Sequence, residues 1–117
     1  MENTYSCDIV YNNNPKSKRF GQYGIALTNN HNCSYINYQD GETVYCNIRK
    51  FSLVKRFYGG EKIGNDAVRS RTHWGCLQII DVDGVIRRLS RDEMWKLAQK
   101  YIRRAAVVVW QIVLKLV

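Results

Sequence analysis

The sequence predicts an α+β domain, a small antiparallel β-sheet of hairpins packed against one long C-terminal helix. Residues 72–89 hold two apolar runs around the turn-forming sequence Asp-Val-Asp-Gly, which is typical of a β-hairpin. Ser90 and Glu93 have the spacing of a capping box, so a helix should begin near Arg91. From Met94 onward, apolar residues recur every three or four positions, which indicates a helix that covers the sheet with one face.

The rest of the sheet is predicted from alternating polar and apolar residues upstream. Residues 1–10 alternate weakly and indicate a first strand. Residues 20–27 and 34–38 bracket an asparagine-rich tip, so they should pair as a second hairpin. Residues 43–58 indicate one further strand, in which basic and aromatic residues are interleaved as on a surface that binds nucleic acid. We therefore expect about four to six strands in a single domain that spans residues 1–117.

Two segments between these strands are predicted to be loops. Residues 11–19 combine asparagines, a proline and three basic residues, which favour an exposed turn. Lys16, Lys18 and Arg19 are candidate contacts for RNA phosphates, and an exposed linker that binds nothing is the alternative. Residues 59–66 are rich in glycine but lack the pattern of a phosphate-binding loop, so they are expected to form a mobile loop.

The charge of the chain points to a polyanionic partner. Eighteen Lys and Arg residues exceed ten Asp and Glu residues, and the net charge is +8. Such a field attracts RNA, DNA or an anionic lipid surface. Four basic residues of the predicted helix form a stripe about 12 Å long. Three arginines at the end of the hairpin and the start of the helix would extend it if they project to the same side. The RNA-binding residues expected here are Lys96, Lys100, Arg103 and Arg104, with Arg87, Arg88 and Arg91.

The cysteines do not form a metal-binding pattern. Cys7, Cys33, Cys46 and Cys76 are too irregularly spaced for a zinc site, so neither a metal nor a cofactor is expected. No apolar segment near the N-terminus resembles a signal peptide. Free thiols in a reducing compartment are therefore predicted.

Residues 105–117 are mostly apolar, although Gln111 and Lys115 interrupt them. They fall short of the roughly 20 apolar residues that span a bilayer. A helix that is buried or covered by a partner is expected, and a strand or a segment at a membrane surface are the alternatives. The partner of this segment would be a second copy of the chain or a membrane.

The predicted hairpin also carries a family resemblance. His73, Trp74 and Gly75 precede an apolar strand and an Asp-Gly turn, and this order resembles the histidine box of the lecithin:retinol acyltransferase-like family. That family includes the picornavirus 2A proteins with a histidine box and an Asn-Cys box, those of parechoviruses and kobuviruses among them, to which residues 72–105 are most similar. The resemblance implies a degenerate acyltransferase-like, permuted papain-like fold.

The resemblance also implies a function. It indicates a viral non-structural protein that acts in replication as a basic RNA-binding or host-interaction module. It implies the cytoplasm of the host cell, with membranes and the nucleus as further locations. A host protein is a further expected partner.

An enzyme is the alternative that the resemblance implies. In the active cellular relatives, a cysteine is the nucleophile and the box histidine is its base. Carried over, His73 is the base and Cys33 of the Asn-Cys pair is the nucleophile of a cysteine acyltransferase or phospholipid hydrolase, in a permuted order. The position that orients the base falls at Arg87, which cannot accept a hydrogen bond, so the constellation is incomplete and a non-catalytic role is expected. Two alternatives stay open, an Asn-Cys box beyond Val117 and an alignment that pairs Gln22 with Cys76.

Overall fold

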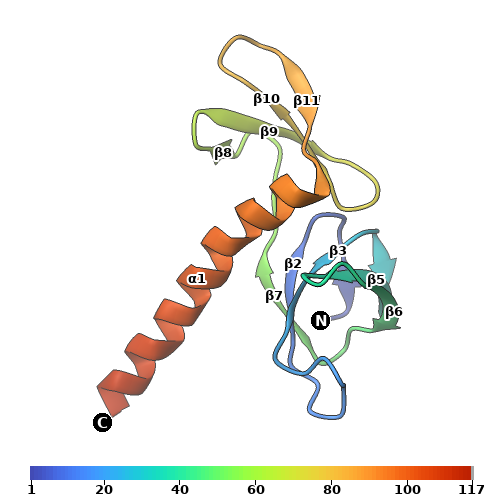
Figure 1. Cartoon of the computed structure of the whole chain (residues 1–117), viewed down its shortest axis with the longest axis vertical. Helices are drawn as coiled ribbons and strands as arrows, with labels where there is room; N and C mark the ends of the chain where they lie inside the picture. The colour runs from blue at the N-terminus through green and yellow to red at the C-terminus, as the bar shows by residue number, and fades with distance from the viewer. Residues whose placement is uncertain (117) are drawn as a thin grey trace.

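The computed structural model describes residues 1–116 and has the predicted α+β architecture. Antiparallel strands form three sheets, and the helix α1 (Arg91–Leu116) follows the last strand (Figure 1). A two-stranded sheet pairs β1 with β4, a five-stranded sheet has the order β6-β5-β3-β2-β7, and a four-stranded sheet has the order β11-β10-β9-β8. The strands are β1 (Asn3–Thr4), β2 (Ile9–Asn12), β3 (Tyr23–Ala26), β4 (Asn30–His31), β5 (Cys33–Tyr38), β6 (Thr43–Asn47), β7 (Phe51–Lys55), β8 (Lys62–Ile63), β9 (Asp66–Arg71), β10 (Leu77–Ile80) and β11 (Ile86–Arg88).

Two predicted strands are divided by turns. Between β1 and β2 the chain turns at Cys7, whose φ is 77°, and the carboxylate of Asp8 accepts a 2.9 Å hydrogen bond from the Tyr5 amide. The predicted strand over residues 43–58 breaks after β6, where the Asn47 side chain accepts a 2.8 Å hydrogen bond from the Arg49 amide. This hydrogen bond from backbone to side chain stabilises a turn, so the chain does not continue as a strand. As a result, β6 and β7 lie at opposite edges of the five-stranded sheet.

Both predicted hairpins are confirmed. β3 pairs with β5, and β10 pairs with β11. In the second hairpin, the Asp81 carboxylate accepts 2.9 Å hydrogen bonds from the amides of Asp83 and Val85, and Gly84 has a φ of 79°. The predicted loop over residues 59–66 is more regular than expected. It contains β8, which pairs with β9.

The predicted capping box fixes the start of α1. The Glu93 amide donates to Ser90 Oγ at 3.1 Å, and the Ser90 amide donates to Glu93 Oε1 at 3.1 Å. The second of these bonds, assisted by Arg87, lowers the pKa of Glu93. Residues 106–116 are helical and do not form a strand.

The core joins both large sheets to the first half of α1. Ile9 and Ile25 of the five-stranded sheet share one buried cluster with Leu77 and Ile79 of the other sheet, and Met94 of the helix packs into the same cluster. A second cluster lies within the five-stranded sheet and its turns. The turn between β9 and β10 is therefore held at the junction of the two sheets.

The second half of α1 leaves the body of the protein (Figure 1). The prediction that it is buried is wrong for the chain alone, since Val107, Trp110 and Leu116 are exposed, Trp110 by 63%. That a partner covers it stays a prediction. Within the described residues, no helix combines the length and the hydropathy needed to cross a membrane.

Candidate functional site

The turn between β9 and β10, residues 72–75, presents His73 and Trp74 to solvent. Trp74 has a φ of 69° and Gly75 a φ of 76°, so two successive residues are left-handed. For a residue with a Cβ atom, this conformation costs roughly 1–2 kcal/mol. His73, Trp74 and Gly75 precede an apolar strand, as the sequence indicated, and this strand, β10, begins at Leu77.

Hydrogen bonds from distant residues hold this turn. Ser6 Oγ accepts a 2.8 Å bond from the Gly75 amide. Arg88 Nη2 donates to the His73 carbonyl at 2.9 Å. Arg91 donates to the carbonyls of Trp74 and Gly75 at 2.6 and 3.3 Å. A strained backbone conformation that several hydrogen bonds hold in place often marks a functional site.

The aromatic row, defined as Tyr45, Tyr35, Trp74 and His73, extends from β6 and β5 to this turn. Neighbouring ring centroids along the row are 4.7, 5.6 and 5.9 Å apart. Tyr35, Tyr45 and Trp74 are 40, 56 and 43% exposed. Because exposed aromatic side chains that gather in one place mark binding surfaces, the row is the candidate functional site.

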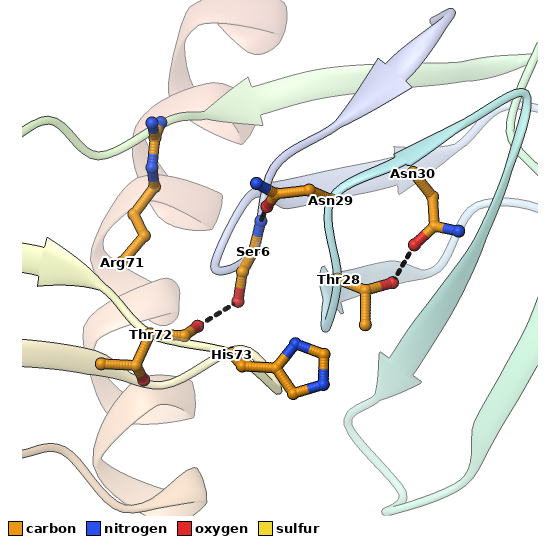
Figure 2. Close-up of a pocket in the computed structure, with 7 residues that line it drawn as sticks. All are labelled: Ser6, Thr28, Asn29, Asn30, Arg71, Thr72 and His73. Carbon is orange, nitrogen blue, oxygen red and sulfur yellow. Dashed lines mark hydrogen bonds between the residues drawn. The ribbon is translucent and has the colours of Figure 1, made fainter.

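A polar cavity of about 380 Å³ opens beside His73 (Figure 2). The His73 ring and the Arg71 side chain both line the cavity and point in different directions in this view. The cavity offers hydroxyl, amide, guanidinium and imidazole groups. Its lining residues are Ser6, Thr28, Asn29, Asn30, Arg71, Thr72 and His73.

Guanidinium groups lie next to the turn at residues 72–75 and in the cavity beside His73. Arg71 lies 4.7 Å from the Tyr5 ring and 5.6 Å from the Tyr58 ring, and Arg56 lies 4.2 Å from the Tyr5 ring on the same part of the surface. Arg88 and Arg91 donate to backbone carbonyls of the turn that carries His73 and Trp74. Positive charge and exposed rings are therefore combined here, as they are on surfaces that bind single-stranded nucleic acid.

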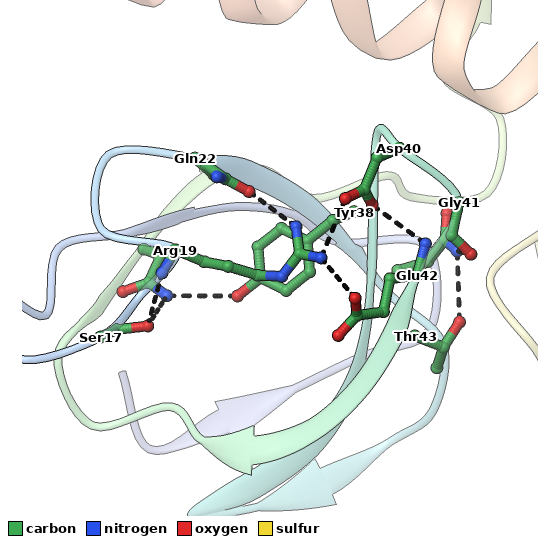
Figure 3. A network of polar contacts seen from close by, with 10 residues as sticks. Ser17, Arg19, Gln22, Tyr38, Asp40, Gly41, Glu42 and Thr43 are labelled. Atoms are coloured by element: carbon green, nitrogen blue, oxygen red, sulfur yellow. Dashed lines mark hydrogen bonds and ion pairs between the residues drawn. The ribbon is translucent and has the colours of Figure 1, made fainter.

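The predicted phosphate-contacting loop is only partly available. Lys16 and Lys18 are exposed. Arg19 instead donates to Asp40 and Glu42 at 2.9 and 2.8 Å and stacks over the Tyr38 ring (Figure 3). The amide of Glu42 and the Arg19 guanidinium both lower the pKa of Asp40. Arg19 thus has a structural partner on the neighbouring turn.

The predicted helix stripe is exposed. Lys96, Lys100 and Arg103 face solvent, and Arg104 lies 5.5 Å from the Tyr101 ring. The three arginines that were predicted to extend the stripe are bound within the protein. Arg88 and Arg91 hold the turn, and Arg87 forms a 2.8 Å ion pair with Glu93.

The structure does not assemble a Cys-His pair among the described residues by hydrogen bonding. No hydrogen bond there joins His73 to a thiol, and Cys33 lies on β5, paired in register with Asn47 of β6. All four cysteines are free. Burial raises the pKa of the Cys7 thiol to about 11, and burial also raises the pKa of Cys46.

Thiol labelling tests the enzyme alternative. In the native protein at about pH 8, iodoacetamide should modify Cys33 and leave Cys7 protected, because Cys7 is buried and holds its proton. Mass spectrometry of tryptic peptides after short exposure measures both rates. A catalytic pair instead requires rapid modification of Cys33 at about pH 6 that the substitution His73→Ala abolishes.

Sequence reasoning missed most of the aromatic row. It singled out His73 but assigned nucleic-acid contacts to the aromatic residues of the segment 49–58, where the structure buries Phe51 and Phe57 and exposes Tyr58. Tyr35 and Tyr45 stand opposite each other in the β5–β6 register. Their outward positions in two alternating strands were a signal, but only the register brings them together.

Comparison with protein-family models, curated proteins and solved structures gives no match for this chain.

Proposed function

We propose that the protein binds single-stranded RNA and that the aromatic row stacks on its bases. The observation that supports this most is Trp74, a bulky exposed side chain held at a φ of 69° beside Tyr35. A strained backbone conformation that exposes an aromatic ring is typical of a functional site. A base that stacks on such a ring contributes about 1–3 kcal/mol to the free energy of binding. The net charge of +8 adds a general attraction for phosphates.

The exposed lysines and arginines supply the second part of the proposal. Arg71 lies beside the row and is a candidate contact for the phosphate backbone. In the helix stripe (Lys96, Lys100, Arg103, Arg104) the Arg104 guanidinium lies beside the Tyr101 ring, and the exposed charges of the stripe suit phosphate contact. A role in RNA replication or host interference, as in a viral non-structural protein of the 2A type, is the wider proposal that rests on this activity.

The test is a salt titration of RNA binding with single substitutions. Trp74→Ala should weaken binding of a single-stranded oligonucleotide roughly 5- to 150-fold, which corresponds to the loss of one stacked base. Tyr35→Ala, on a strand, should act in the same direction without altering the turn. Fluorescence anisotropy with a labelled RNA measures the affinity, and duplex RNA of the same sequence should bind more weakly.

The controls separate stacking from charge. Phe20→Ala removes an exposed ring outside the row and should leave the affinity unchanged. The triple change Lys100→Glu, Arg103→Glu and Arg104→Glu should weaken binding of all sequences and flatten its salt dependence. If Trp74→Ala and Tyr35→Ala both bind as tightly as the parent, the row is not the binding site. If the parent does not bind even at low salt, the proposed function is wrong.

A further inference from the structure

Exposed apolar side chains lie on opposite sides of the second half of α1. At 3.6 residues per turn, Val107 and Leu114 lie on one side of the helix, and Ile112 and Leu116 lie on the opposite side. All four are at least half exposed, and Trp110 is exposed as well. An isolated helix this apolar is not expected to remain in water. Something must therefore enclose it rather than cover one face.

The charge beside this end of the helix has a single sign. No Asp or Glu follows Glu93 in the sequence, whereas five basic residues do, four in the helix stripe and Lys115. Lys96, Lys100, Arg103 and Arg104 lie on the part of α1 next to the apolar end. An apolar segment next to a group of cations suits a membrane that contains anionic lipid, because the apolar side chains contact the hydrocarbon and the cations contact the headgroups.

From these observations we propose that the apolar end of α1 inserts into one leaflet of an anionic membrane. Residues 105–116 extend about 18 Å. Because an ammonium group at the bilayer centre is costly, the segment lies obliquely under the headgroups, so that the long Lys115 side chain reaches them. The helix stripe would then lie among the lipid headgroups. This mode of binding leaves the aromatic row free, because the row belongs to β5, β6 and the turn at residues 72–75. The helix stripe, in contrast, is shared between the lipid headgroups and the phosphates of the proposed RNA ligand.

A second copy of the chain suits the same surface less well. A groove of about 590 Å³ between α1 and the five-stranded sheet, with Tyr11, Leu53 and Trp110 in its lining, is apolar enough to receive one side of a helix. A symmetric pair would nevertheless leave the other side of each helix in water. A parallel pair would also bring two rows of like charge towards each other where α1 packs against its copy. Lipid encloses the helix without either penalty.

The test is flotation of the full chain with lipid vesicles. The parent should float with vesicles of phosphatidylcholine that contain about one third phosphatidylserine, and at least tenfold more weakly with pure phosphatidylcholine, because the basic residues meet no anionic headgroups there. The triple variant Trp110→Ser, Ile112→Ser and Leu116→Ser should lose most of the binding. It should keep its RNA affinity, which distinguishes this proposal from the proposed function.

A matched control removes three exposed apolar residues elsewhere. Val82→Ser, Val85→Ser and Ile86→Ser, in the β10–β11 hairpin, should float as the parent does. In a variant with Trp74→Phe and Trp95→Phe, brominated lipid should quench the fluorescence of Trp110. The proposal is overturned if the parent ignores anionic vesicles, or if the Trp110, Ile112 and Leu116 variant binds them equally well. A dimer in ultracentrifugation that those serines dissociate, without vesicle binding, would assign the surface to a second copy.

Discussion

Replacing Arg56 by methionine is expected to lower the free energy of unfolding by about 3–5 kcal/mol, because it leaves a buried carboxylate without its counter-charge. The Asp8 side chain is fully buried, and Arg56 Nη2 donates to its Oδ2 at 2.8 Å. Arg56 Nε donates to the other oxygen at 3.0 Å, so the pair is bidentate. This contact raises the pKa of Arg56.

The exposed ion pair between Arg87 and Glu93 provides the matched control. Its N–O distance is also 2.8 Å, but both side chains reach solvent. Arg87→Met should therefore change stability by no more than about 1 kcal/mol. Urea denaturation followed by circular dichroism measures both variants. The double change Asp8→Asn with Arg56→Met should recover part of the loss, and equal effects of Arg56→Met and Arg87→Met would contradict the importance of burial.

Replacing Gly75 by alanine should destabilise the protein by about 3 kcal/mol, because the strain of the left-handed conformation adds to overpacking. A Cβ atom at this position would lie 2.7 Å from Leu27 Cδ2 and 2.9 Å from Arg91 Nη1. It would also lie 3.2 Å from the Ala26 carbonyl oxygen, which belongs to a sheet and moves little. Thermal unfolding measures the effect, and the RNA affinity should fall with it as Trp74 is displaced.

A substitution at Gly84 separates the cost of the left-handed conformation from the cost of overpacking. Its φ of 79° is almost the same, but a Cβ atom there meets no heavy atom within 4 Å. Gly84→Ala should therefore cost only the conformational part, about 1–2 kcal/mol. If Gly75→Ala is no more destabilising than Gly84→Ala, the turn is able to move away from β3, and the row is less firmly held than the structure indicates.

The parts of the fold that were predictable have local causes. The capping box of Ser90 and Glu93 and the Asp81–Gly84 turn each depend on residues within four positions of one another, so their side chains suffice to predict them. The division between β6 and β7 was missed because the alternation of apolar residues continues across the turn at Asn47. A pattern in one segment does not show which strands become its neighbours.

The candidate site was less predictable than the fold because it depends on long-range contacts. Ser6 and Gly75 are 69 positions apart, yet their hydrogen bond helps to set the conformation of Trp74. Arg88 and Arg91 were predicted from charge alone to bind RNA, whereas the structure shows them bound to backbone carbonyls. That they also contact RNA stays a prediction. The charge of an arginine alone does not indicate which group it binds.

The continuity of α1 has a mechanical consequence. No glycine or proline follows Gly84 in the sequence, so the helix contains none of the residues at which a helix commonly kinks. Met94 is fixed in the core while Leu116 lies far out in solvent. A rotation imposed on the outer end is therefore passed to both sheets as torque. A fluorophore at Gln111 should accordingly report the tumbling of the whole molecule and not a faster local motion.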